Sequence, residues 1–152
     1  MYVKVDDLNH STREQDNSQM RVCENIKASK VCKGSVIFPK RGAAIMTNKV
    51  RIMGDNGYMD TNMMALEPID VNSDFLYLFI SGTGLYKIAD TSTIPQINNK
   101  HIEPYEIKMP KIEEQIQIGN CFRNIDTLIT LHQRKCDKLV EVKKYMLKNM
   151  FI

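Results

Sequence analysis

The residues of this 152-residue chain best suited to nucleophilic chemistry are its three histidines and four cysteines. They are His10, His101, His132, Cys23, Cys32, Cys121 and Cys136. His132 and Cys136 are four residues apart, so on a helix their side chains are within reach of each other and a Cys–His nucleophile pair is one interpretation. Such a pair also needs an orienting third group and a pocket, which a helix-packing seam does not offer. We therefore favour a packing role for both residues.

The residue spacing gives little indication of a metal site or a nucleotide-binding site. The cysteines form no pair with the spacing of two to four residues that zinc sites use, and the aspartates are scattered. Gly82-Thr83-Gly84 lacks the third glycine of a dinucleotide loop and the Lys-Ser/Thr of a phosphate-binding loop, which indicates a turn. We expect no catalytic residues, no metal and no cofactor, and therefore no enzyme activity. The start of the chain shows no secretion signal, so we expect reduced thiols and a cytoplasmic location.

Positive charge is concentrated in one part of the chain. The net charge of +3 is made by 21 Lys and Arg against 18 Asp and Glu. Residues 25–54 contain no Asp or Glu but seven basic residues, which are Lys27, Lys30, Lys33, Lys40, Arg41, Lys49 and Arg51. A one-sided basic block in an otherwise acidic domain is typical of proteins that bind polyanions. The alternative is a solvated lysine face without a ligand.

Side chains that recognise nucleic acid occur in and after this block. Lys40 and Arg41 stand between Pro39 and Gly42, where a partner can approach the backbone closely. Amide side chains can bind adenine in a bidentate way, and Arg or Lys can bind guanine or neutralise phosphate. The alternative for asparagines such as Asn48 and Asn99 is that they only cap turns. The candidate DNA-binding residues are Lys40, Arg41, Thr47, Asn48, Lys49, Gln96, Asn98, Asn99 and Lys100.

Residues 1–110 must position these side chains, and their patterns indicate a mixed α+β domain. Tyr2–Val5 alternates like a half-buried strand, residues 9–19 read as a polar surface loop, and residues 35–38 form a compact apolar strand that Pro39 stops. Residues 43–53 have a hairpin-like pattern. The apolar run at residues 75–80 fits either a buried strand or a short helix capped by Ser73 or Asp74.

The remainder of this domain is less regular in sequence. Residues 20–32 are ambiguous between a short helix and irregular structure, and residues 54–57 form a strong turn signal with two glycines. Residues 91–96 suit a turn in which Pro95 begins a short helix.

The clearest element is a long helix over residues 111–152. No proline interrupts it, Glu113 and Glu114 lie at its start, and lysines gather at its end, as the helix dipole favours. Such a helix reaches roughly 60 Å, too long to fold back on a domain of about 110 residues, so we expect it to protrude and form a coiled coil. Alternate steps of four and three residues define its seam, which His132, Cys136 and Lys143 interrupt. Apart from Lys143, the seam residues are Ile118, Phe122, Ile125, Ile129, His132, Cys136, Leu139, Met146 and Met150.

Five strings occur in order along the chain: residues 34–43 (GSVIFPKRGA), 47–49 (TNK), 93–100 (TIPQINNK), Met109-Pro110 with Glu114, Gln115, Ile118 and Gly119, and 131–135 (LHQRK). Together they resemble the DNA specificity subunit of type I restriction-modification systems, over nearly the whole chain. The resemblance implies a mixed α/β target-recognition domain at 1–110, which binds double-stranded DNA, followed by a conserved helix at 111–152.

The resemblance also implies partners. Two recognition domains, held apart by an antiparallel pair of such helices, would bind the two halves of a split site. The helices would dock the methyltransferase subunits and the restriction subunits, which carry the catalysis.

Two departures from the family pattern leave alternatives open. Family members carry two recognition domains and two helices, whereas this chain has one of each. Family domains also extend some thirty residues upstream of the strand at Tyr2, so we expect that part of the domain is missing. The chain is then either a half-subunit, pairing with itself or with another specificity subunit, or a truncated structural partner that acts only through its helix without reading DNA.

Overall fold

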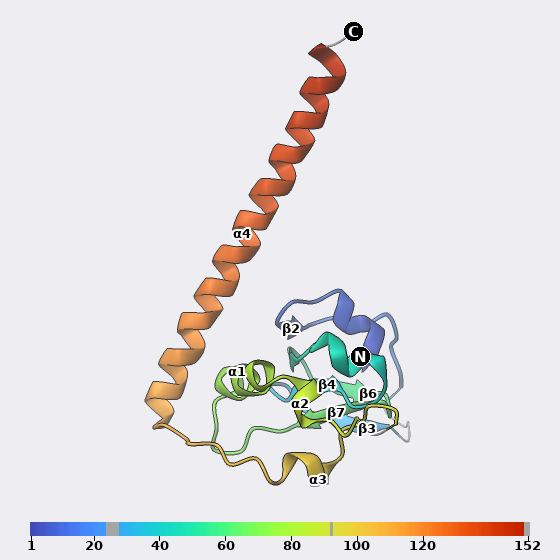
Figure 1. The fold of residues 1–152 in the computed structure, drawn as a ribbon, viewed down its shortest axis with the longest axis vertical. Coiled ribbons are helices and arrows are strands. Elements are labelled where there is room, and N and C mark those ends of the chain that lie inside the picture. The colour runs from blue at the N-terminus through green and yellow to red at the C-terminus, as the bar shows by residue number, and fades with distance from the viewer. Residues whose placement is uncertain (24–27, 92, 151–152) are drawn as a thin grey trace. The chain divides into compact units, whose positions relative to one another are not determined.

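The computed structural model describes residues 1–23, 28–91 and 93–150, and it contains two small β-sheets followed by helices (Figure 1). The first sheet has the order β1-β6-β3, with β1 parallel and β3 antiparallel to β6. Its strands are β1 (Tyr2–Val3), β6 (Gly57–Met59) and β3 (Ser29–Val31).

The second sheet has the order β2-β5-β4-β7, with β2 parallel to β5 and the other pairs antiparallel. Its strands are β2 (Glu14–Gln15), β5 (Arg51–Met53), β4 (Val36–Pro39) and β7 (Met63–Leu66). The helical elements are the 3₁₀ helices η1 (Val5–Asn9) and η2 (Ala43–Thr47), and the α-helices α1 (Ser73–Thr83), α2 (Leu85–Ile88), α3 (Asn99–Ile102) and α4 (Ile112–Met150).

Strand β4 is the centre of the domain, because it is buried on both faces. Its side chains alternate between two cores, as the period of two in a strand requires. Val36 and Phe38 pack in one core with Leu76 and Ile80 of α1. Ile37 belongs to the second core, which also contains the following buried residues: Val3, Leu8, Val31, Met53 and Met63. The strand expected at 35–38 is thus confirmed as β4, shifted by one residue so that Pro39 is its last residue and pairs with Met63. Burial on both faces explains its unbroken apolar sequence.

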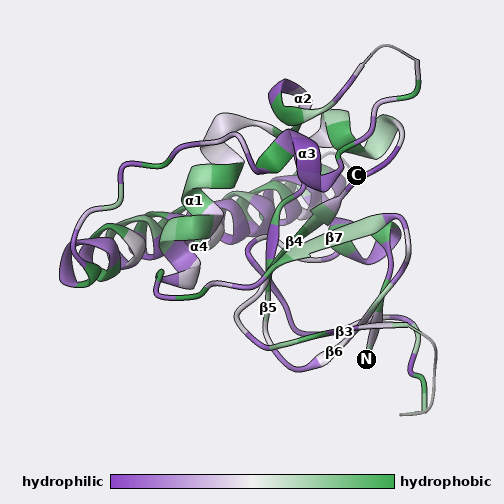
Figure 2. Cartoon of the chain, turned by 90° about the horizontal axis from the view of Figure 1, so that it is seen from below, coloured by the Kyte–Doolittle hydropathy of each residue, from purple (hydrophilic) through white to green (hydrophobic). Residues whose placement is uncertain are grey.

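Helix α1 resolves the ambiguity of the apolar run at residues 75–80. Its cap is Asn72, whose side-chain oxygen accepts a hydrogen bond from Phe75 N at 3.1 Å, so neither Ser73 nor Asp74 is the cap. The helix ends at Gly84, which has a positive φ of 85°. Figure 2 shows α1 as predominantly hydrophobic, in keeping with its position on the core of β4.

Several other local expectations were wrong. The strand at Tyr2 ends at Val3, because Lys4 N donates to the Asp7 carboxylate at 2.8 Å and η1 begins there. The polar segment 9–19 contains β2, with Arg13 and Gln15 buried. The ambiguous segment 20–32 contributes β3, and its residues 24–27 lie outside the described residues.

Two turn segments also differ from expectation. Residues 43–53 form η2 and β5 instead of a hairpin, because Asn48 adopts the left-handed conformation that ends η2. Pro95 does not begin a helix, since Gln96 is held in backbone bridges to Arg41 and Asp90, and α3 starts only at Asn99. Ser92 lies outside the described residues.

A buried ion pair joins the N-terminal segment to α1. Arg13 Nη2 and Nε lie 3.1 Å and 3.2 Å from Asp74 Oδ1, and the guanidinium lies 4.7 Å from the centroid of the Tyr77 ring. The side chains are only 8% and 15% exposed. Because water is largely excluded, each charge depends on the other for its solvation.

The long helix expected at the C-terminal end is confirmed as α4, with 39 residues. Two compact units divide the chain, Met1–Ile116 and Gln117–Ile152. The first turn of α4 belongs to the first unit, where the buried Gln115 accepts a hydrogen bond from Asn72 N and donates one to Pro110 O, both at 2.9 Å. The described helices include none that combines the length and hydrophobicity needed to cross a bilayer.

The first prediction concerns the Arg13–Asp74 pair. Asp74→Ala should lower the free energy of unfolding by about 3 kcal/mol, because it leaves a buried guanidinium without its carboxylate. Urea unfolding followed by circular dichroism measures this. Asp6→Ala, at an exposed aspartate in η1, is the control and should change stability by less than about 0.5 kcal/mol. Equal stability of the two variants would show that the pair contributes nothing.

Candidate nucleic-acid interface

Backbone hydrogen bonds bring three distant segments together at the end of β4. Lys40 N donates to Asn62 O at 2.9 Å, Ile97 N donates to Lys40 O at 2.9 Å, and Gly42 N donates to Pro95 O at 2.8 Å. Arg41 also forms an antiparallel bridge with Gln96. We call the segments 40–42, 60–62 and 95–100 together the rim. Two of the predicted DNA-binding strings, 40–41 and 96–100, are therefore neighbours in space.

Most side chains of the rim are polar or basic and open to solvent; the exceptions in character are the acidic Asp60 and the apolar Pro95 and Ile97. Arg41, Asn98, Asn99 and Lys100 are exposed, and Lys40 is half-buried. In the part of the chain that the structure describes, Lys40, Arg41 and Lys100 take part in no salt bridge. These three cations are therefore available to neutralise phosphates.

Gly42 makes the turn of the rim possible. Its φ of 76° and ψ of −165° fall in a region that side chains other than glycine rarely adopt. A Cβ at this position would meet no atom within 4 Å. The requirement for glycine is thus conformational, and the space beside this backbone is open.

Asn48, a predicted base-reading residue, has a structural role. Its Nδ2 donates to Ser81 O and its Oδ1 accepts from Leu85 N, both at 2.9 Å. It also has a positive φ of 50°, which asparagine tolerates better than most residues. With both ends of the amide committed to backbone groups, Asn48 joins η2 to α1 and α2, and the structure favours the turn-forming alternative.

The neighbours of Asn48 are also engaged within the domain. Thr47 Oγ1 donates to Ala44 O at 2.6 Å, and Lys49 Nζ donates to Asn9 Oδ1. None of the hydrogen bonds that hold the rim together involves residues 47–49.

The basic block at residues 25–54 does not form one surface. Arg51 donates to Leu8 O at 2.7 Å and Ser11 Oγ at 2.9 Å, and its burial lowers the pKa of the guanidinium from its ordinary value, although Tyr77 acts in the opposite sense. Lys33 lies at the Asn56 end of β6, where its backbone N–H donates to Asn56 Oδ1. Lys27 lies outside the described residues. Of the basic residues described in the block, only Lys40 and Arg41 belong to the rim.

Sequence reasoning missed the part of the rim formed by the turn Asp60–Asn62 between β6 and β7. Thr61 and Asn62 are exposed polar residues between two apolar strands. The polar string Asp60-Thr61-Asn62 was the available signal for a turn. Its position beside Lys40 depends on the β4–β7 pairing, which a local pattern does not reveal.

The predicted seam residues of α4 are exposed in the single chain, except Ile118, which is half-buried. Phe122, Ile129 and Met150 are 46%, 62% and 68% exposed. One uninterrupted helix places the whole set on one face, because steps of three and four residues return to the same side. The set is Ile118, Phe122, Ile125, Ile129, His132, Cys136, Leu139, Met146 and Met150.

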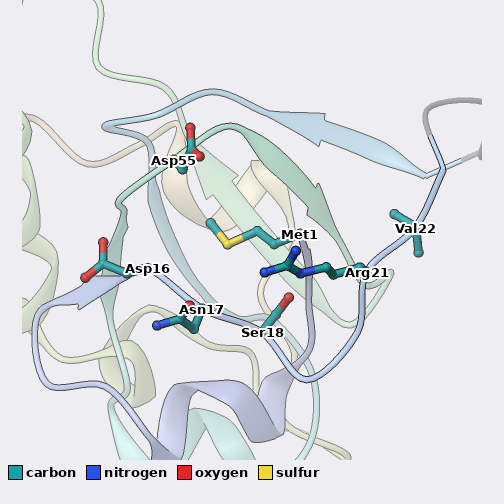
Figure 3. Close-up of a pocket in the computed structure, with 7 residues that line it drawn as sticks. All are labelled: Met1, Asp16, Asn17, Ser18, Arg21, Val22 and Asp55. Carbon is teal, nitrogen blue, oxygen red and sulfur yellow. The ribbon is translucent and has the colours of Figure 1, made fainter.

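A separate polar pocket of about 320 Å³ lies near the N-terminus (Figure 3). Met1, Asn17, Ser18 and Val22 line it together with Asp16, Arg21 and Asp55. Figure 3 shows the Arg21 side chain beside Met1 and Ser18, with the two carboxylates on the other side. No histidine or cysteine is among these lining residues. In the described ranges no group of three or more His, Cys, Asp or Glu could hold a metal ion.

Comparison with known proteins finds similarity over most of the chain. Residues 2–141 match the family described as the type I restriction modification DNA specificity domain. The chain is 31% identical over 103 residues to the type I restriction enzyme MjaVIII specificity subunit of Methanocaldococcus jannaschii. That alignment covers 65% of this chain and 24% of the relative, so the chain spans about a quarter of the length of this relative.

The fold is also similar to a solved structure. A chain from work on the "structural basis underlying complex assembly and conformational transition of the type I R-M system" matches with a TM-score of 0.75 and 15% sequence identity. The match covers 95% of this chain and 35% of the other. At this identity the match concerns the fold, and it includes the mixed sheets and the long helix that the sequence predicts.

The second prediction separates structural from DNA-contacting asparagines. Asn48→Ala should lower the free energy of unfolding by about 2 kcal/mol, because it leaves Ser81 O and Leu85 N without their partners. Asn99→Ala, at an exposed rim asparagine, should change stability by less than about 0.5 kcal/mol. Thermal unfolding of both variants measures the difference. If Asn48→Ala is as stable as the wild type, the structural role assigned to its amide is wrong.

Proposed function

The chain belongs to the family of the type I restriction modification DNA specificity domain, and on that premise we propose that its rim binds one half of a split DNA site while α4 recruits the other subunits. The observation that carries the proposal is the backbone hydrogen bonding of residues 40–42 to residues 95–97, which brings basic side chains close to amide side chains. In the same proposal residues 1–110 form the target-recognition domain and residues 111–152 the partner-docking helix.

The rim offers the two kinds of contact that a specific DNA interface needs. Lys40, Arg41 and Lys100 would neutralise phosphates and fix the position of the domain on the duplex. Gln96, Asn98 and Asn99 would contact base edges in the groove, because amides can both donate and accept. Thr47, Asn48 and Lys49, which are engaged elsewhere in the domain, are not part of this proposed surface.

The seam of α4 suits an antiparallel partner helix. A pairing centred between His132 and Cys136 would place Ile118 against Met150 and Ile129 against Leu139. Exposed apolar side chains of this number favour association over a free monomer. The partner helix belongs to a second copy or to another specificity subunit, and the pair would provide the docking platform for methyltransferase and restriction subunits.

Specificity subunits of type I systems are non-catalytic, so catalysis falls to the partner subunits. Methyl transfer and DNA cleavage would then need the assembled complex. A cytoplasmic location follows from this proposal, because the DNA and the partner subunits are there.

The third prediction tests the phosphate contacts. In the chain assembled with its methyltransferase subunit, Lys40→Ala with Arg41→Ala should weaken binding to all duplexes. It should also reduce the slope of log affinity against log salt by about one unit for each lost phosphate contact. Fluorescence anisotropy with a random-sequence duplex over a salt series measures both quantities.

The matched control for this variant is Lys30→Ala with Lys33→Ala, which removes the same charge from exposed residues outside the rim. It should leave the slope within measurement error of the wild type. Equal slopes for all three proteins would contradict the proposed role of the rim.

The fourth prediction concerns the helix. Ile129→Asp should abolish self-association or partner binding, because it places an unpaired charge in the seam. Multi-angle light scattering at tens of micromolar measures the mass. Thr127→Asp adds the same charge on the opposite face of α4 and should leave association unchanged. A stable, well-folded wild-type monomer that also fails to bind a methyltransferase subunit would contradict the proposal.

A further inference from the structure

The turn between β6 and β7 is held from both sheets of the domain. Asp60 N donates to Val3 O at 2.9 Å, which ties the turn to the first sheet. Asn62 O accepts from Lys40 N at 2.9 Å, which ties it to the second sheet. Met63 N donates to Asp60 O at 3.0 Å and closes the turn. Its backbone is therefore fixed at each end, although the side chains of Thr61 and Asn62 are exposed.

The carboxylate of Asp60 orients the two exposed side chains. Its Oδ1 accepts from Thr61 N at 2.8 Å and lies 3.4 Å from Thr61 Oγ1. Its Oδ2 accepts from Asn62 Nδ2 at 3.1 Å. Because an ionised carboxylate only accepts hydrogen bonds, the nitrogen of the Asn62 amide must face Asp60, and the orientation of the amide is determined.

After the hydrogen bond to Asp60, the Asn62 amide still has one donor and one acceptor for a ligand. One hydrogen of Nδ2 is used by Asp60, which leaves the other hydrogen and Oδ1 for a ligand. Adenine presents in the major groove an N6 donor beside an N7 acceptor, the complement of this pair. An amide whose orientation is already fixed loses less conformational freedom on binding than a free one.

The turn also lies at the right place for a base contact. Hydrogen-bonded backbones lie about 4.8 Å apart, so Asn62, Lys40 and Ile97 fall within about 10 Å of one another. This distance corresponds to about three base-pair steps of about 3.4 Å. Lys40 and Arg41 can therefore contact phosphates while Asn62 and Gln96 reach neighbouring bases on either side.

We propose that Asn62 is a specificity-determining residue that recognises adenine in the bound half-site, and that Asp60 is a positioning residue that fixes its amide. The inference rests on the proposed function, because it assumes that the rim binds DNA. It adds to that function one residue, one base and one orienting contact.

The test is selection from a pool of randomised duplexes by the 152-residue chain assembled with its methyltransferase subunit, followed by sequencing. Asn62→Ala should lose the preference for one A·T pair by roughly tenfold or more, since good bidentate contacts discriminate to this degree. Its other positions, and its salt dependence on a random duplex, should match the wild type. Asp60→Ala should weaken the preference at that same pair, an effect that a merely structural residue would not confine to one base.

Two controls keep this outcome interpretable. Asn56→Ala removes an exposed turn asparagine at the opposite end of β6 and should leave the selected sequence unchanged. Asn62→Gln moves the amide outward and should change the preference at the same pair, while its thermal unfolding matches that of the wild type.

The results separate the two proposals. A sequence preference that is identical in the wild type, Asn62→Ala and Asn62→Gln would overturn the role of Asn62 and leave the proposed function standing. No sequence preference in the wild type would overturn both. A preference lost at one G·C pair, or at several pairs at once, would contradict the assignment to adenine.

Discussion

The burial of β4 on both faces is the constraint on which the rest of the domain depends. Val36, Ile37, Phe38 and Pro39 are all buried, and they supply side chains to two cores at once. Burial of each large side chain contributes on the order of 2 kcal/mol, so the strand is fixed by hydrophobic packing before any polar contact is considered. Where this apolar run ends, Lys40 and Arg41 follow without a linker. The position of the basic pair is thus set by the core.

The end of the strand also determines what surrounds the basic pair. Pro39 has no N–H to donate, so the next available donor is that of Lys40, which bonds to Asn62 O. The carbonyl of Lys40 accepts from Ile97 N, and Gly42 turns the chain away with a positive φ. Three segments from different parts of the sequence meet there because the backbone groups of one short stretch must find partners.

The sequence predicts those elements whose pattern is local. Strand β4 has a compact apolar run with a proline stop, and α4 has more than four heptads without a break, so both are confirmed. The run that became α1 could not be assigned, because a fully buried helix and a buried strand share the same unbroken hydrophobicity. The approach of residues 40–42 to 60–62 and 95–97 depends on long-range pairing, which no window of sequence contains. Asn48 shows the same limit, since its partners Ser81 and Leu85 are more than thirty residues away.

The residues of this domain fall into two groups that differ in how well they should tolerate substitution. Gly42, Asn48 and Arg51 hold the frame through a positive φ or through bonds to backbone carbonyls, so substitution there disturbs the structure. Thr61, Asn62, Gln96 and Asn99 lie at positions whose backbone is held by other groups, and they are not part of the hydrophobic cores. Their side chains can vary without moving the backbone that presents them. In the proposed function, a recognition surface built in this way would acquire a new target sequence at little cost in stability, because the geometry of the rim is determined by groups other than those proposed to contact bases.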